Sequence, residues 1–119
     1  ACKISDKKIL NKSNIVKVIT DEEISKENMS RANTFSREIS LNNNLNVYHH
    51  IGIYMYKVST LEKFVNLKQS KNEMDQNLEQ LRAIDNNFEI NVILANSSPI
   101  GIDTEEDFME IKKIMNYKN

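Results

Sequence analysis

The sequence VYHHIGIYMY at residues 47–56 alternates in hydrophobicity and is rich in residues that favour β-structure, so it predicts a central strand. Gly52 within it marks a place where a ligand or another backbone comes close. A β-branched run at 15–19 predicts a second strand. Further strands are predicted at 32–37 and 88–94.

Two serines stand three residues before a glutamate, in Ser59–Glu62 and Ser70–Glu73. This is the capping-box spacing that satisfies free amides at a helix start. It predicts helices at 60–66 and 71–86. Apolar residues of the longer helix recur every three or four positions and form a core stripe: Met74, Leu78, Leu81 and Ile84. The polar residues Glu73, Gln76 and Gln80 lie along another face, which can reach a cleft.

A last helix is predicted at 104–117, capped by Thr104 after a loop at 96–101 that contains the single proline. Its inward residues are expected to be Phe108, Ile111, Ile114 and Met115. The polar region 24–46 predicts an arm with a mobile tip at 42–44.

Composition narrows the class of protein. The chain has 119 residues, which is enough for one domain. It shows no internal repeat or linker, so we expect a single α/β unit. A net charge of -1 with scattered lysines argues against a nucleic-acid surface. The single Cys2 can form no internal disulfide and is expected to be a small buried or terminal hydrophobe. No apolar run approaches the ~20 residues that span a bilayer, so a soluble, cytoplasmic protein is expected.

Three strings stand in fixed order: HIGIY at 50–54, LEQLR at 78–82, and GIDT at 101–104, which is followed by Glu106 and Asp107. From about Asn14 to Tyr117 they resemble the C-terminal half of the 3-deoxy-manno-octulosonate cytidylyltransferases, or CMP-Kdo synthetases. That family joins CTP to the acid sugar Kdo and releases pyrophosphate, for lipopolysaccharide biosynthesis.

The resemblance implies the C-terminal part of a Rossmann-like nucleotide-diphospho-sugar transferase fold, an α/β fold with a mixed sheet. Residues 1–119 would be a single partial domain that begins at Ala1 rather than methionine. The glycine-rich and basic nucleotide-binding loop of the family would be absent. We therefore expect the fragment alone to be inactive, and the whole enzyme to be a homodimer.

The resemblance also implies a metal ligand and catalytic residue, Asp103, which comes just before the helix cap. Mg²⁺ suits this role because it binds one or two carboxylates together with substrate phosphates. The adjacent His49 and His50 are not expected to grip one ion, because neighbours on a strand point to opposite faces.

Five residues are implied to bind the sugar. His50 and Tyr54 would contact the sugar acid from one face of the strand, and Glu79 and Gln80 would bind Kdo hydroxyls. A glutamate accepts hydrogen bonds and a glutamine both donates and accepts, which suits a polyol. Arg37, in a Phe-Ser-Arg string, would grip the carboxylate with two parallel hydrogen bonds.

Other interpretations remain open. Without the resemblance, His50 and Tyr54 are a satisfied core pair and Asp103 is a surface aspartate. Arg82 is expected to pair with a nearby acid or to cover the helix surface. The chain could serve another acid sugar, such as 8-amino-Kdo or a sialic acid. It could also be a non-catalytic remnant that dimerises or binds sugar.

Overall fold

A computed structural model describes residues 1–5, 7–39, 45–97, 101–102 and 104–115, so Asp103, Pro99 and the tip at 42–44 lie outside the described residues. The strands are β1 (Cys2–Lys3), β2 (Lys17–Thr20), β3 (Ser30–Ser36), β4 (Asn46–His49) and β5 (Asn91–Val92), in the sheet order β1-β4-β2-β3-β5. The helices are the 3-10 helix η1 (Lys7–Asn11) and the α-helices α1 (Val58–Val65), α2 (Lys71–Gln76), α3 (Gln80–Asp85) and α4 (Glu105–Met115).

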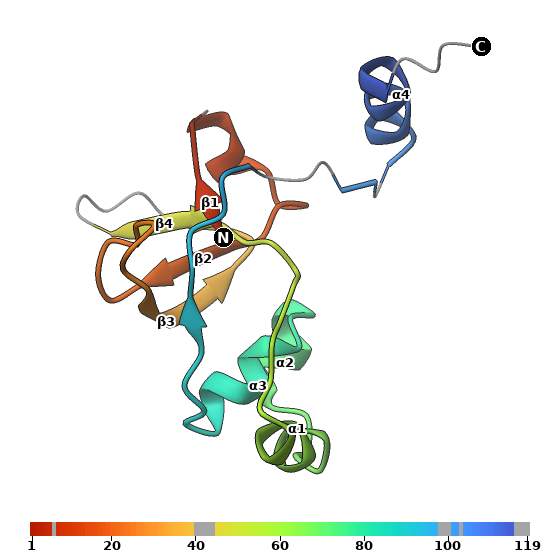
Figure 1. The fold of residues 1–119 in the computed structure, drawn as a ribbon. Coiled ribbons are helices and arrows are strands. Elements are labelled where there is room, and N and C mark those ends of the chain that lie inside the picture. The colour runs from red at the N-terminus through yellow and green to blue at the C-terminus, as the bar shows by residue number, and fades with distance from the viewer. Residues whose placement is uncertain (6, 40–44, 98–100, 103, 116–119) are drawn as a thin grey trace.

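The chain has an α/β fold, as expected, with α1, α2 and α3 gathered on one side of the sheet (Figure 1). Every strand pairing among the described residues is antiparallel. The parallel strands of the expected mixed sheet are therefore not found in the described part of this chain.

Strand β2 lies in the middle of the sheet and is paired along both edges. Its Val18 stands opposite Phe35 of β3 and Tyr48 of β4, and all three side chains are buried. Residues that stand opposite one another share a face of the sheet, so these three side chains form the sheet side of the core. Leu78 and Leu81 from the helical side belong to the same core cluster. The strand predicted at 15–19 is confirmed, with a start two residues later.

The region 24–46 is not a simple exposed arm. Ile24 is fully buried, and its backbone N–H donates to the Tyr48 hydroxyl at 3.0 Å. Strand β3 then lies between β2 and β5, with Ala32 and Phe35 buried. The pairing of β3 with β2 is irregular near Asn33, so Ala32 and Phe35 are both buried although they are three residues apart. The strand predicted at 32–37 is therefore confirmed, and it begins two residues earlier, at Ser30.

The sheet curls until its two outer strands meet. The Ala1 ammonium group donates to the Ile93 carbonyl at 3.0 Å, and the Ala95 N–H donates to the Ala1 carbonyl at 2.7 Å. Cys2 is buried beside this closure, as its residue type predicted. The strands predicted at 47–56 and 88–94 are shorter than expected. A Cβ atom at Gly52 would have no described atom within 4 Å, so no described backbone approaches it.

Only one of the two predicted capping boxes forms. At the start of α2, the Ser70 hydroxyl accepts from the Glu73 N–H at 3.2 Å, and the Glu73 carboxylate accepts from the Ser70 N–H at 3.2 Å. Helix α1 instead begins after Lys57, which makes no side-chain cap. Ser59 therefore lies inside α1 and not at its cap.

The helix predicted at 71–86 is broken into α2 and α3 at Asn77, whose φ is 52°. Asparagine tolerates this left-handed conformation better than most residues, so it can end a helix where no glycine stands. Leu78 and Leu81 are buried as predicted, but Met74 is 55% exposed, because the break turns α2 out of the stripe. Asn87, with a φ of 60°, adopts the same conformation just after α3.

Helix α4 stands away from the sheet and the other helices (Figure 1). Its predicted cap is confirmed, because the Thr104 hydroxyl accepts from the Asp107 N–H at 3.2 Å. The prediction that Phe108 and Met115 face inward is wrong, since they are 44% and 55% exposed. The apolar stripe of α4 has no sheet beside it in the described part of the chain.

Replacing Ser70 with alanine removes the acceptor for the Glu73 N–H. We expect Ser70→Ala to lower the free energy of unfolding by about 1 kcal/mol. Ser59→Ala is the matched control, because Ser59 is exposed inside α1 and should change the free energy by less than about 0.5 kcal/mol. Urea unfolding followed by circular dichroism measures both variants. Equal losses in the two variants would contradict a stabilising cap at Ser70.

Candidate functional site

Five of the six predicted site residues fall within the described chain, and they come from three places. Arg37 follows β3, His50 and Tyr54 follow β4, and Glu79 and Gln80 stand at the start of α3. The sixth residue, Asp103, lies outside the described residues.

His50 and Tyr54 form a direct pair. The His50 Nε2 atom lies 2.7 Å from the Tyr54 hydroxyl oxygen, and the two ring centroids are 5.6 Å apart. Phe35 packs edge-on against His50 at a centroid distance of 5.2 Å. Burial lowers the pKa of His50 to about 4, with a smaller contribution from the nearby N-terminal charge. The imidazole is therefore neutral near pH 7, and it can accept a hydrogen bond from the phenol.

A row of aromatic rings continues from this pair towards the helices. Consecutive centroid distances are between 5.2 and 6.5 Å along Phe35, His50, Tyr54, Tyr56, Phe64 and Phe88. Rings at such distances gain packing energy beyond the area that they bury. The row therefore connects the end of β4 with α1 and with the chain that follows α3.

Glu79 lies close to this row. Burial raises the pKa of Tyr54 and of Tyr56, and the negative charge of Glu79 raises both further. The Glu79 side chain is 70% exposed, so its carboxylate is open to a ligand in water. The structure thus brings three predicted site residues, His50, Tyr54 and Glu79, to one side of the molecule.

Gln80 carries a side-chain nitrogen that is buried without a hydrogen-bond partner among the described residues. An amide donor that is buried unpaired costs roughly 1–3 kcal/mol. Such an atom in a folded protein needs an explanation, and a ligand oxygen is one. Gln80 follows Glu79 directly, so its amide belongs to the same end of α3.

Among the described residues, no hydrogen bond or ion pair of Arg37 reaches the other four. Its Nε atom donates to the Gln76 carbonyl at 3.4 Å, and its Nη1 atom donates to the Ser13 carbonyl at 3.3 Å. Both acceptors are neutral backbone oxygens. Gln76 ends α2 three residues before Glu79, which places Arg37 near the helix break but not in the His50–Tyr54 pair.

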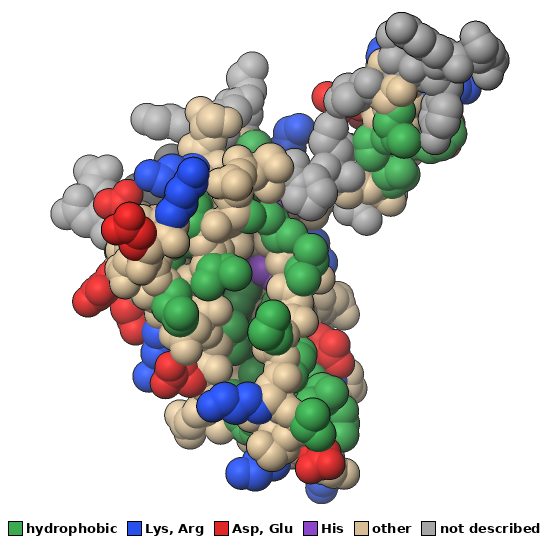
Figure 2. All heavy atoms as spheres, viewed as in Figure 1, with side chains coloured by type: hydrophobic (Ala, Val, Ile, Leu, Met, Phe, Trp, Pro, Cys, Tyr) green, Lys and Arg blue, Asp and Glu red, His purple; other side chains and the backbone are tan. Residues whose placement is uncertain are grey.

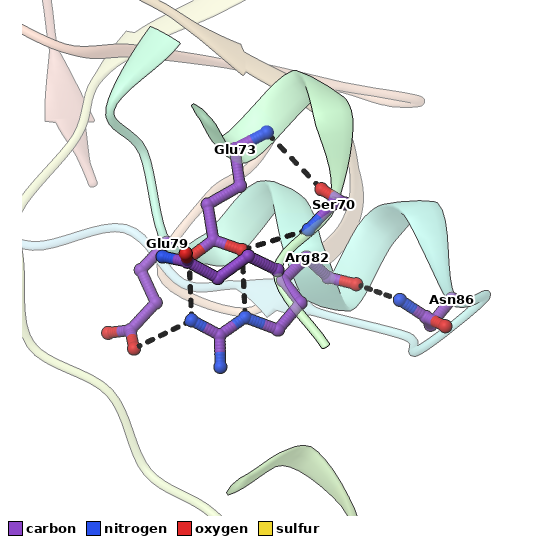
Figure 3. A network of polar contacts seen from close by, with 6 residues as sticks. Ser70, Glu73, Glu79, Arg82 and Asn86 are labelled. Carbon is purple, nitrogen blue, oxygen red and sulfur yellow. Dashed lines mark hydrogen bonds and ion pairs between the residues drawn. The ribbon is translucent and has the colours of Figure 1, made fainter. Parts of the chain in front are cut away.

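The prediction that Arg82 pairs with a nearby acid is confirmed, and the acid is Glu73 (Figure 3). Two parallel hydrogen bonds join them, at 2.8 Å from Nε and 2.5 Å from Nη2. Glu73 was expected on a cleft-facing polar surface, but its side chain is buried. The capping-box spacing carried this information, because a capping glutamate turns back towards the helix start.

Other surfaces of the described chain give little support for a site. A pocket of about 290 Å³ contains no predicted site residue and is lined by Ile19, Thr20, Asp21, Asn33, Leu45 and Asn46. Among the described residues, no three side chains of the His, Cys, Asp and Glu types gather as they would around a metal ion. None of the described helices combines the length and the apolar character needed to cross a membrane.

Apolar side chains are unusually exposed next to the candidate site. Ile53, Met55 and Val58 are 82%, 99% and 74% exposed. Hydrophobic side chains gather over the middle of the face shown in Figure 2, and charged side chains lie mainly around its margin. Several exposed apolar side chains so close together in the chain are typical of an association surface.

Comparisons with known proteins agree on one family. A model of the family described as cytidylyltransferase matches residues 1–96. Proteins named 3-deoxy-manno-octulosonate cytidylyltransferase are 42% identical over 105 residues in Bartonella bacilliformis, covering 88% of this chain and 42% of the relative, and 36% identical over 112 residues in Agrobacterium fabrum, covering 94% and 44%. The chain thus spans less than half the length of these relatives.

A solved structure has the same fold. It is described as CMP:2-keto-3-deoxy-manno-octonic acid synthetase complexed with CTP, and it matches with a TM-score of 0.72 at 24% identity. The match covers 89% of this chain and 43% of that protein. At this identity, the likeness concerns the fold.

The His50–Tyr54 pair predicts an unusual titration. We expect His50 to titrate near pH 4 in NMR spectra of its imidazole, mainly because the ring is buried. Tyr54→Phe should raise this pKa by a smaller amount, because the neutral imidazole loses a hydrogen-bond donor while the ring stays buried. The folded protein binds this proton less readily than the unfolded chain. The corresponding stability is complete above about pH 6.5 and is lost as the pH falls towards 4.

Tyr56→Phe is the matched control, because Tyr56 lies next in the aromatic row and contacts Tyr54. It should leave the pKa of His50 nearly unchanged. An imidazole that titrates near 6.5 in the unmodified protein would contradict the buried pair.

Proposed function

This chain belongs to the cytidylyltransferase family, and from that premise we propose that it is the C-terminal, sugar-binding part of an enzyme that activates 3-deoxy-manno-octulosonate (Kdo) with CTP. The products would be CMP-Kdo and pyrophosphate. The named relatives and the CTP complex of the structural neighbour support both substrates. Such an enzyme would be a nucleotidyltransferase of lipopolysaccharide biosynthesis.

The observation that carries the proposal is the unpaired buried amide of Gln80 beside the exposed carboxylate of Glu79. Together they offer a donor and an acceptor to neighbouring sugar hydroxyls. The neutral His50–Tyr54 pair adds a second donor and acceptor on the same side. A polyol is distinguished from similar sugars by matched hydrogen bonds, because a missing hydroxyl leaves buried groups unpaired.

Arg37 is proposed as the ligand of the sugar carboxylate. In the ligand-free chain its guanidinium donates to two backbone carbonyls. A carboxylate is a stronger acceptor than a neutral carbonyl, because both partners are then ionised. Binding of the sugar acid would therefore exchange weaker contacts of Arg37 for stronger ones.

In the reaction, the anomeric oxygen of Kdo would bond to the α-phosphorus of CTP as the bond to the β-phosphate breaks. The residues of this chain would hold the sugar so that its anomeric hydroxyl lies in line with that bond. Asp103 would hold Mg²⁺ together with phosphate oxygens, and the ion would supply positive charge for the leaving pyrophosphate. We place the cytidine-binding residues in the part of the relatives that this chain does not span.

We further propose that the enzyme is a cytoplasmic homodimer. The exposed apolar side chains of Ile53, Met55 and Val58 support a surface that is covered by a second copy. The surface lies within the chain segment that carries His50 and Tyr54, so association and sugar binding would be adjacent.

The decisive assay is pyrophosphate release by the full-length protein encoded in the reading frame that contains this chain. We expect release with CTP and Mg²⁺ only when Kdo is present, and a fall of at least about 100-fold in Asp103→Asn, because a metal ion contributes several kcal/mol of charge stabilisation. The 119-residue chain alone should form no CMP-Kdo.

Glu106→Gln is the matched control, because Glu106 is an exposed acid in the first turn of α4. It should leave the rate unchanged. No release from the folded, full-length protein would reject the enzyme and favour a sugar-binding or dimerising remnant. A higher kcat/KM for an amino sugar acid than for Kdo would change the substrate.

A second prediction separates sugar binding from folding at Gln80. Gln80→Leu replaces the unpaired donor with an apolar group of similar size, so we expect the folded protein to be at least as stable as before. We also expect the KM for Kdo to rise about tenfold while the KM for CTP is unchanged. Thermal unfolding and initial rates measure the two effects. An unchanged KM for Kdo would remove Gln80 from the site.

A further inference from the structure

The proposed sugar site is assembled from two separate parts of the chain. His50 and Tyr54 come from the segment after β4, and Glu79 and Gln80 come from the start of α3. The Glu79 side chain is 70% exposed, so burial alone does not fix its position. A ligand that contacts both parts requires other residues that hold the two parts at a fixed position relative to each other.

Near these two parts, the Arg82 side chain is held in place by a buried ion pair with Glu73. Its side chain is 12% exposed and that of its partner Glu73 is 6% exposed. Glu73 is itself held by the Ser70 N–H at 3.2 Å and by the Gln69 side-chain amide at 3.3 Å. The hydrogen bonds from Arg82 lower the pKa of Glu73 to about 2, so the pair stays ionised at any physiological pH.

The same guanidinium reaches both parts of the proposed site. Its Nη2 atom lies 3.4 Å from a carboxylate oxygen of Glu79 (Figure 3). Its central carbon lies 5.1 Å from the centroid of the Phe64 ring, a cation–π contact. The Phe64 ring packs against the ring of Tyr56, which in turn packs against the ring of Tyr54. Arg82 therefore contacts Glu79 directly and contacts Tyr54 through two rings.

We propose that Glu73 and Arg82 are positioning residues for sugar recognition, which hold the Glu79 carboxylate in place near Tyr54 and Tyr56. The forked geometry of arginine is what allows this, because one guanidinium can bind Glu73 with two donors and still reach Glu79. Neither residue of the pair needs to touch the sugar. This inference rests on the proposed role of Glu79 in binding Kdo.

Arg82→Lys is the informative variant, because lysine keeps the charge and one bond to Glu73 but lacks the fork. In the full-length protein we expect the KM for Kdo to rise about tenfold, with kcat and the KM for CTP little changed. Asp75→Asn is the matched control. It breaks the exposed Lys71–Asp75 ion pair on the same helix as Glu73, and it should change none of these constants.

A double-variant cycle separates positioning from general stability. In a Glu79→Gln background, we expect Arg82→Lys to raise the KM for Kdo by less than about twofold, because the group that it positions is already altered. If Arg82→Lys raises the KM for Kdo by the same factor with Glu79→Gln as without it, the two residues act independently and the proposal is overturned. An unchanged KM for Kdo in a folded Arg82→Lys protein would also overturn it.

A ligand-free measurement keeps this inference distinct from the proposed function. The carboxyl carbon signal of Glu79 in NMR spectra should shift in Arg82→Lys and stay in place in Asp75→Asn. If the unmodified protein binds no Kdo, the proposed function fails and this signal alone tests the positioning. A Glu79 signal that does not respond to Arg82→Lys would then overturn it, and a shift would support it.

Discussion

The register of β2 against its two neighbours is the constraint on which the rest of the structure depends. Val18 stands opposite both Phe35 and Tyr48, which fixes the face that each strand turns towards the core. Side chains alternate along a strand, so a slip of one residue would exchange the two faces. His50 lies two positions beyond Tyr48, and its contact with Phe35 follows from the same register. The opposite face carries Lys17, whose buried amino group donates to the carbonyls of Lys12 and Arg37 at 2.6 Å.

The helical side depends on a different kind of contact. Helices α2 and α3 are each only six residues long, and helices of that length are not stable by themselves. The Glu73–Arg82 pair joins one to the other, and Leu78 and Leu81 attach both to the sheet core. Removing one member of a buried ion pair leaves the other charge unpaired, which makes such a pair strongly interdependent. Arg82 of the same pair also contacts Glu79, so stability and the proposed sugar recognition share a residue here.

The sequence predicted the parts that local chemistry determines. The β-branched run at 15–19, the Ser70–Glu73 cap and the acid partner of Arg82 follow from residue type and spacing. The break at Asn77 could not be predicted, because its neighbours continue an apolar stripe of helical period and only packing decides where α2 ends. The same holds for the contacts of Arg37, which come from distant backbone. Of the proposed site, His50 and Tyr54 were expected on one face of a strand, but β4 ends at His49 and the two side chains pair beyond its end. The unpaired amide of Gln80 depends on its three-dimensional surroundings.

The break at Asn77 has a consequence for how the specificity of the proposed sugar site would change during evolution. It moves Glu79 and Gln80 from the interior of a long helix to the first positions of a short one. Backbone N–H groups in a first turn have no partner within the helix, so these positions contribute few of its internal hydrogen bonds. Substitutions there alter the chemistry offered to a ligand at little expense to helix formation. For the sugar-binding role proposed above, such substitutions would change specificity at little cost in stability, while Arg82 and the core residues keep the same architecture.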